Sequence, residues 1–146
     1  VDGGAIRGML PATILREIER RTGQPISELF HLIGGTSVGC VLTAALSTPA
    51  NPEQPVKLWK PKIKAEELVQ MFYDKKEAIL HKRTIPFGSL YDVSSLENVI
   101  EDFCGQTTFH QSLVPTVGVV YDVLARANRA FCSWDEEIFL KKDIIL

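Results

Sequence analysis

A serine flanked by glycines is the feature of the sequence with the clearest chemical meaning. Residues 35–39 read Gly-Thr-Ser-Val-Gly, which is the G-x-S-x-G pattern of a nucleophile elbow. In an elbow the glycines allow a sharp backbone turn that lifts the serine hydroxyl to the N-terminus of a helix, where partial positive charge stabilises an oxyanion. The pattern therefore predicts Ser37 as a nucleophile, in an elbow completed by Gly35, Thr36, Val38 and Gly39.

The segments around this serine fit that interpretation. Only His31 can carry charge between Glu28 and Glu53, and glycines interrupt this apolar stretch. A membrane-spanning helix is disfavoured, because a helix interior does not tolerate clustered glycines well. We expect a buried strand over 29–33, a glycine turn and a buried helix over 39–46, as in a parallel α/β sheet covered on both faces.

A second glycine-rich turn, residues 2–8, reads Asp-Gly-Gly-Ala-Ile-Arg-Gly and stands directly before a predicted helix. Consecutive small residues expose backbone N–H groups that can converge on an anion, and Arg7 adds a positive charge. A nucleotide-binding loop is the competing interpretation, but no Lys-Ser or Lys-Thr pair follows, as a Walker loop requires. The candidate anion-binding residues are Gly3, Gly4, Ala5, Arg7 and Gly8.

Together, the two turns resemble the patatin-like phospholipase family. The resemblance implies a three-layer α/β/α domain with a mostly parallel central sheet. It also implies a lipid acyl hydrolase of the phospholipase A or esterase type that uses a Ser-Asp dyad. Ser37 aligns with the family's nucleophile, and the loop from Gly3 to Gly8 aligns with its oxyanion hole. Supporting similarity extends over Pro11, Ile14-Leu15, Leu29-Phe30, and residues 62–73, 90–92 and 114–122.

Three features depart from the family pattern. Ala5 stands where glycine is usual, and its methyl group restricts φ and the approach to the oxyanion. Cys40 replaces a glycine after the elbow, which we interpret as a change in packing. The family's catalytic Asp lies in a D-G-G or D-G-A pattern, yet no Asp after Ser37 is followed by Gly. We therefore expect the dyad Asp outside residues 1–146, and negligible turnover by this segment alone.

Both ends of the sequence look incomplete. Val1-Asp2 reads as the end of a strand, and Asp143 as the first residue of a helix. We expect residues 1–146 to be the N-terminal and central part of one patatin-like domain, truncated at both ends. No signal peptide is visible, and the odd number of cysteines favours a reducing compartment. These observations predict a cytoplasmic location or one peripheral to a membrane.

Two other functions stay open at this point. The chain order Ser37, Asp102, His110 formally fits a Ser-His-Asp hydrolase, although Asp102 falls on a predicted helix over 94–104 and His31, His81 and His110 each suit a structural role. A non-catalytic lipid- or protein-binding module is the second alternative. A basic loop around an aromatic residue would contact an anionic membrane in that case, although a solvated loop is favoured. Its residues are Lys57, Trp59, Lys60, Lys62 and Lys64.

Composition narrows the partners further. The 146 residues carry a net charge of −2, which gives no overall basic field for nucleic acid. The three cysteines lack zinc-site spacing, so we expect neither a metal nor another cofactor. A lipid or phospholipid remains the expected substrate, with peripheral membrane contact.

The remaining pattern alternates helices and strands, which is typical of an α/β fold. Helices are expected from Pro11 to Thr22, over 65–80 and over 94–104, and a strand pair over 114–121 and 129–133. The connections are expected at 24–28, 49–62 and 81–93.

Overall fold

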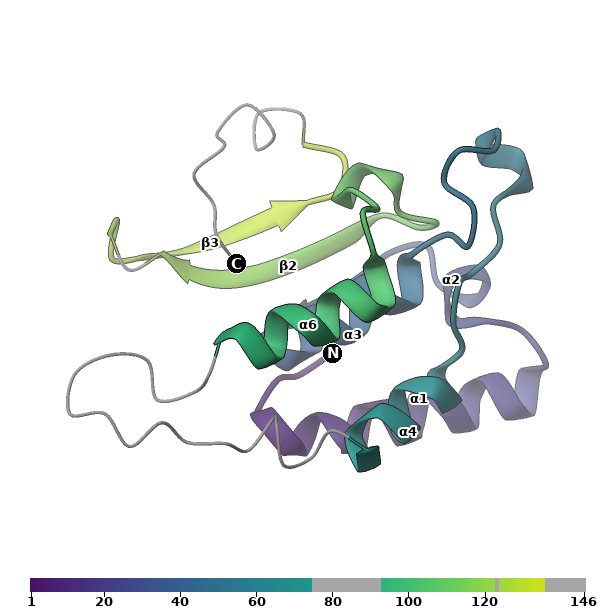
Figure 1. The fold of residues 1–146 in the computed structure, drawn as a ribbon, viewed down its shortest axis with the longest axis horizontal. Coiled ribbons are helices and arrows are strands. Elements are labelled where there is room, and N and C mark those ends of the chain that lie inside the picture. Colours follow the sequence, from purple (N-terminus) through teal and green to yellow (C-terminus); the bar gives the residue numbers. More distant parts are fainter. Residues whose placement is uncertain (75–92, 123, 136–146) are drawn as a thin grey trace.

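A computed structural model describes residues 1–74, 93–122 and 124–135 (Figure 1). The described residues combine helices with a three-stranded sheet that contains a parallel pair, which confirms the predicted α/β class. The helices are η1 (Ala5–Gly8), α1 (Met9–Thr22), α2 (Ile26–Leu29), α3 (Val38–Ser47), η2 (Val56–Leu58), α4 (Ala65–Asp74), α6 (Val93–Cys104) and η3 (Phe109–Gln111), where η marks a 3-10 helix. The strands are β1 (Ile33–Thr36), β2 (Thr116–Asp122) and β3 (Ala127–Cys132).

The described strands form one sheet in the order β1-β2-β3. β1 runs parallel to β2, with Ile33 opposite Thr116 and Thr36 opposite Val119, and β2 runs antiparallel to β3. The first residue of the chain pairs with β1 on its other side. The Val1 nitrogen donates to the Gly34 carbonyl at 2.5 Å, and the Thr36 N–H donates to the Val1 carbonyl at 3.2 Å. This is the bonding pattern of parallel strands, so β1 is enclosed on both sides near its carboxyl end.

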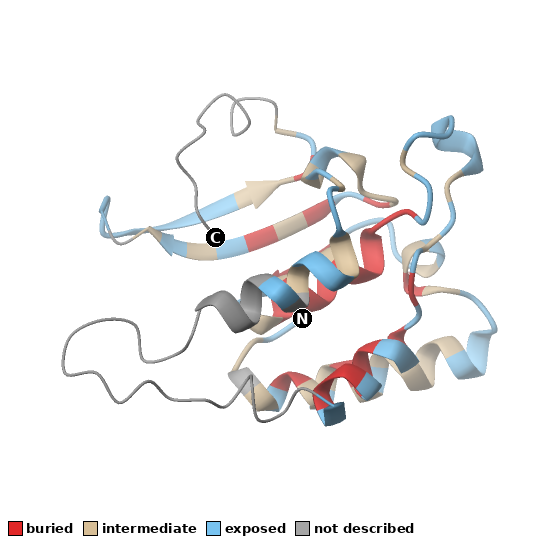
Figure 2. Ribbon diagram, viewed as in Figure 1, coloured by how far each residue is buried: buried red, intermediate tan, exposed pale blue. Residues whose placement is uncertain are grey.

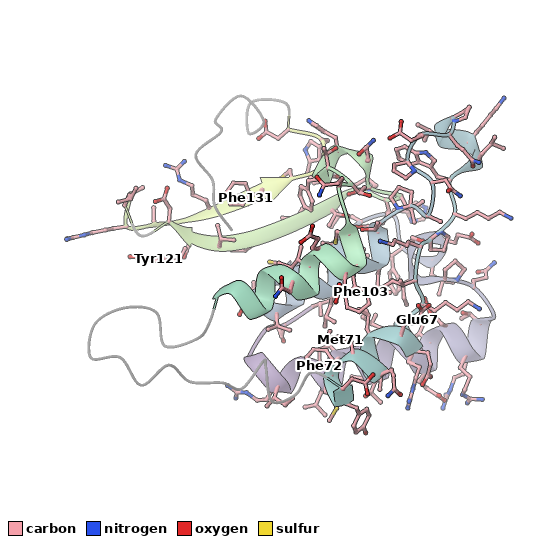
Figure 3. All side chains as sticks on the ribbon, viewed as in Figure 1. Glu67, Met71, Phe72, Phe103, Tyr121 and Phe131 are labelled. Carbon is pink, nitrogen blue, oxygen red and sulfur yellow. The ribbon has the colours of Figure 1, made fainter. Side chains whose placement is uncertain are left out.

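Helix α3 forms the centre of the described core. It packs against β1 and β2, with α6 against its outer side, while α1 and α4 pack on each other (Figure 1). Most residues of α3 are buried, as are those of α4 that face the core (Figure 2). Phe103 of α6 packs against a core that includes Met71 and Phe72 of α4 (Figure 3). Burial of this apolar surface is the main favourable contribution to folding.

The carboxylate of Glu19 connects three helices. It lies near the end of α1 and accepts the Ile26 N–H at 3.0 Å and the Ala65 N–H at 2.8 Å. These two residues are the first of α2 and α4, where backbone N–H groups have no partner within their own helix. The Glu19 carboxylate therefore accepts the first backbone N–H group of both α2 and α4.

The structure corrects the segment before the serine. The predicted strand over 29–33 is wrong, because Leu29 ends helix α2 and β1 begins only at Ile33. Phe30 and Leu32 are exposed, so the apolar run that suggested a buried strand is partly a surface connection. The predicted connection over 24–28 is also wrong in part, since α2 starts at Ile26 on the Glu19 carboxylate.

The other described elements agree with the sequence patterns. α1 begins two residues before Pro11, and α3 covers the predicted helix 39–46. α6 and the β2–β3 pair are found where predicted, and 49–62 contains only the short η2. The later part of the predicted helix 65–80, the connection after it and the helix start at Asp143 lie outside the described residues. Among the described helices, none has both the length and the apolar composition to cross a bilayer.

Candidate active site

Ser37 occupies a strained turn between β1 and α3. Its backbone has φ 53° and ψ −129°, a conformation that side-chain-bearing residues rarely adopt. Such residues cost about 1–3 kcal/mol each and occur mainly where function requires them. The Ser37 side chain is exposed. It also forms no capping hydrogen bond to α3, although serine at this position usually caps the helix.

The glycines of the elbow are needed because other backbone lies against them. A Cβ atom at Gly35 would lie 2.7 Å from the Cys40 nitrogen and closer still to the Gly39 carbonyl. A Cβ atom at Gly39 would lie 2.9 Å from the Val1 carbonyl carbon. Neither position has room for a side chain, so the turn can be this sharp only with glycine at both.

The second glycine turn lies directly against this serine. A Cβ atom at Gly3 would lie 2.5 Å from Ser37 Cβ and closer still to the Thr36 carbonyl oxygen. The Gly3 N–H donates to Thr36 Oγ1 at 3.3 Å. Two segments that are more than thirty residues apart in the sequence thus meet at one hydroxyl-bearing residue.

From this contact the loop turns into a helix. Gly4 has φ 125°, which favours glycine, and η1 follows it and continues into α1. The first N–H groups of a helix have no intrahelical acceptor, and those of Ala5 and Ile6 begin η1. Ala5 is the first residue of η1, so the alanine that departs from the family pattern stands at the start of this helix.

Two contacts hold this helix start in place. A Cβ atom at Gly8 would lie 2.7 Å from Val38 Cγ1 and 2.9 Å from Phe72 Cζ, so Gly8 fits closely between α3 and α4. The exposed side chain of Arg7 extends over the loop, with its Nε 3.1 Å from the position of a Cβ atom at Gly4. The predicted residues Gly3, Gly4, Arg7 and Gly8 are therefore adjacent to the elbow or to each other.

Cys40 lies beneath the elbow and packs α3 against the sheet. Its Sγ donates to the Gly35 carbonyl at 2.8 Å and lies 3.6 Å from the Val119 carbonyl oxygen. Burial raises the pKa of this thiol above its ordinary value, because the thiolate would lose its hydration. The thiol stays protonated near neutral pH, in agreement with a packing role.

The alternative catalytic triad is wrong, because its other members lie at the opposite end of α3. Lys62 donates its N–H to the Thr48 carbonyl at 2.9 Å and its Nζ to the Asp102 carbonyl at 3.4 Å. Thr48 directly follows the last residue of α3, whereas Ser37 precedes the first. A ten-residue α-helix is about 15 Å long, which places Asp102 far beyond hydrogen-bonding reach of Ser37.

His110 lies at that same remote end. Its Nδ1 is 2.7 Å from the Ser133 carbonyl oxygen, and the Ser133 N–H donates to Thr116 at the start of β2. In the parallel register Thr116 faces Ile33, at the end of β1 opposite to Ser37. His110 therefore lies at the end of the sheet where β1 and β2 begin, whereas Ser37 follows the last residue of β1. The exposed His31 precedes β1, and His81 lies outside the described residues.

The basic loop that contains Lys57 to Lys64 lies beside the C-terminal end of α3, the end opposite to Ser37. Its backbone pairs with residues just after the helix, since the Ala50 N–H donates to the Lys60 carbonyl at 2.8 Å. Trp59 is held within the loop by a 2.8 Å hydrogen bond from Nε1 to the Gln54 carbonyl. Membrane contact through Lys57, Lys60, Lys62 and Lys64 stays a prediction. No group of three or more potential metal ligands occurs within residues 1–74, 93–122 and 124–135.

The comparison with protein families agrees with this arrangement. A family model described as patatin-like phospholipase matches residues 1–142. The chain belongs to the patatin-like phospholipase family. It is 31% identical over 130 residues to Patatin-T5 of Solanum tuberosum and 32% identical over 130 residues to Patatin-17 of Solanum cardiophyllum. In both cases the match covers 84% of this chain and 32% of the relative, so the chain spans about a third of the patatins it matches.

Within this patatin-like chain, sequence reasoning missed one contribution to the site. Thr36 was assigned to the elbow only by its place in the pattern, whereas its hydroxyl also contacts the Gly3 loop. The available signal was only that a hydroxyl-bearing residue directly precedes the serine. The loop partner could not be derived from the pattern, because more than thirty residues separate the two segments.

Proposed function

We propose that this chain contributes the nucleophile and the oxyanion-binding loop of a lipid acyl hydrolase. Ser37 is the proposed nucleophile, and the backbone N–H groups of Gly4 and Ala5 are the proposed oxyanion donors. Family membership supports the substrate class, a fatty-acyl ester. The observation that carries the proposal is the strained, uncapped backbone of Ser37, which lies against the glycine loop.

The proposed reaction needs one further group. Ser37 Oγ attacks the ester carbonyl while its proton passes to a carboxylate, which we place outside residues 1–146. The tetrahedral oxyanion receives hydrogen bonds from the loop amides and collapses to an acyl-serine, while the carboxyl group gives its proton to the leaving alcohol of the lipid and becomes a carboxylate again. Water, deprotonated by the same carboxylate, then attacks the acyl-serine and releases the fatty acid. A direct Ser-Asp arrangement needs no histidine, which is compatible with the remote position of His110.

A non-catalytic binding module would not need the backbone strain at Ser37. Strain of this kind persists only where the surrounding structure enforces it, and it adds nothing to affinity for a lipid surface. The hydrolase is therefore the better supported of the two functions.

The first prediction concerns Ser37 in the complete protein that carries this chain. Ser37→Ala should lower hydrolysis of p-nitrophenyl butyrate by at least about 10³-fold, because loss of a nucleophile removes the covalent route. The matched control is Ser27→Ala, since the buried Ser27 hydroxyl has no hydrogen-bond partner among the described residues and its removal should leave turnover unchanged. Comparable activity in the Ser37→Ala protein would contradict the proposal.

A further inference from the structure

The segment that leads into the glycine loop is attached to the elbow almost entirely through backbone. Val1 pairs with β1 through two hydrogen bonds, and its carbonyl packs on Gly39. Gly3 packs on the Thr36 carbonyl and on Ser37. These packing contacts set the distance between the loop and the serine. Packing against a glycine has no preferred direction, however, so it does not fix the orientation of the loop peptides.

Thr36 supplies the missing directional bonds. Its backbone N–H donates to the Val1 carbonyl at 3.2 Å, and its side-chain Oγ1 accepts the Gly3 N–H at 3.3 Å. One residue therefore contacts the segment on both sides of Asp2. The bond to Gly3 fixes the orientation of the Asp2–Gly3 peptide, which lies one peptide before the Gly4 N–H; the φ of Gly4 is 125°.

We propose that Thr36 is a positioning residue whose hydroxyl orients the Gly3–Gly4 segment, and through it the backbone amides that receive the oxyanion. This inference rests on the proposed hydrolase function and assigns a role to a side chain that does not itself react. Its physical basis is that catalytic donors must be held within about 0.5 Å of the productive position. A flexible pair of glycines requires an external hydrogen bond to meet that condition.

The exposure of Thr36 separates this role from a purely structural one. The Thr36 side chain is exposed and Gly3 is only half-buried, so water can replace the hydroxyl as a partner for the Gly3 N–H. Loss of the hydroxyl should then change protein stability little. The turnover number should fall much more, because water does not hold the peptide in one orientation.

The test compares two substitutions at this position in the complete protein. Thr36→Val keeps the shape and removes the hydroxyl, whereas Thr36→Ser keeps the hydroxyl. We expect Thr36→Val to lower kcat for p-nitrophenyl butyrate about tenfold with KM nearly unchanged, and Thr36→Ser to restore kcat to within about threefold of the parent. Thr13→Val is the matched control, because it removes a threonine hydroxyl that donates to the Met9 carbonyl at 2.7 Å within α1.

Active-site titration with a fluorophosphonate gives the fraction of competent protein, so a loss of folded material is not mistaken for a loss of kcat. Equal kcat values for Thr36→Val and the parent would overturn the positioning role, as would failure of Thr36→Ser to restore kcat. If Ser37→Ala is inactive in the same assay, either of these outcomes overturns only the role of Thr36 and leaves the proposed function in place. Full activity of Ser37→Ala would overturn the proposed function instead.

Discussion

The two ends of helix α3 are built in opposite ways. At its N-terminal end, Ser37 and Thr36 are exposed, and backbone approaches backbone at glycines that have no room for a Cβ atom. At its C-terminal end, Ser47 and Thr48 are buried, and their carbonyls accept N–H groups from Leu113 and Lys62 at 2.7 and 2.9 Å. The N-terminal end of α3 therefore has backbone strain and exposed hydroxyl groups, whereas the polar groups named at its C-terminal end are buried and hydrogen-bonded.

This difference shows which polar residues are available for chemistry. A serine or threonine with its hydrogen bonds satisfied inside a helix contributes to stability, and Ser47 donates to the Thr43 carbonyl in this way at 2.8 Å. Ser37 forms no such bond to its helix, and its backbone conformation is costly. We therefore propose that the N-terminal end is organised around a reaction, whereas the C-terminal end is part of the core.

The comparison predicts its largest effect at Gly3. Gly3→Ala should lower ester hydrolysis by about 10²-fold or more, because the added methyl group would displace either the loop or Ser37. Gly23→Ala is the matched control. Gly23 adopts a left-handed conformation, with φ 71°, and no atom of the described residues lies within 4 Å of the added Cβ. It should lose about 1 kcal/mol of stability and keep its turnover number. Similar kinetics for the two variants would remove the claim that the loop and the serine are in contact.

A smaller effect, on stability alone, is expected at the other end. His110→Ala should leave kcat within about twofold and reduce the free energy of unfolding by about 1 kcal/mol, since it removes the hydrogen bond to the Ser133 carbonyl. Denaturant titration measures the stability, and steady-state kinetics measure the turnover. A drop in kcat of about 10³-fold would show that His110 takes part in the reaction and would contradict its position away from Ser37.

The smallest effect on catalysis is expected at Cys40. Burial raises the pKa of its thiol, so the neutral form should predominate near neutral pH. Cys40→Ala should therefore leave the pH profile of kcat/KM near neutral pH unchanged and lower stability by about 1 kcal/mol through lost packing. A change in the shape of the profile would show that the thiol takes part in the reaction.

Much of this arrangement could be predicted from local sequence. The glycines at 35 and 39 and the apolar residues after them predicted the turn and helix α3, because turn chemistry and helical periodicity are local properties. The strand before the serine was misplaced, since a run of apolar residues does not reveal that Phe30 and Leu32 are exposed. The positions of Asp102 and His110 could not be predicted, because they depend on long-range packing at the end of α3.

The central claim is that Ser37 reacts through an activated hydroxyl. It is tested most directly by treating the complete protein with a fluorophosphonate and mapping the modified peptide by mass spectrometry. We predict a single adduct on Ser37, and none in a Ser37→Gly variant whose stability is equal to or greater than that of the parent, because glycine relieves the positive φ. An adduct on another residue, or equal labelling of the Ser37→Gly variant, would contradict the account.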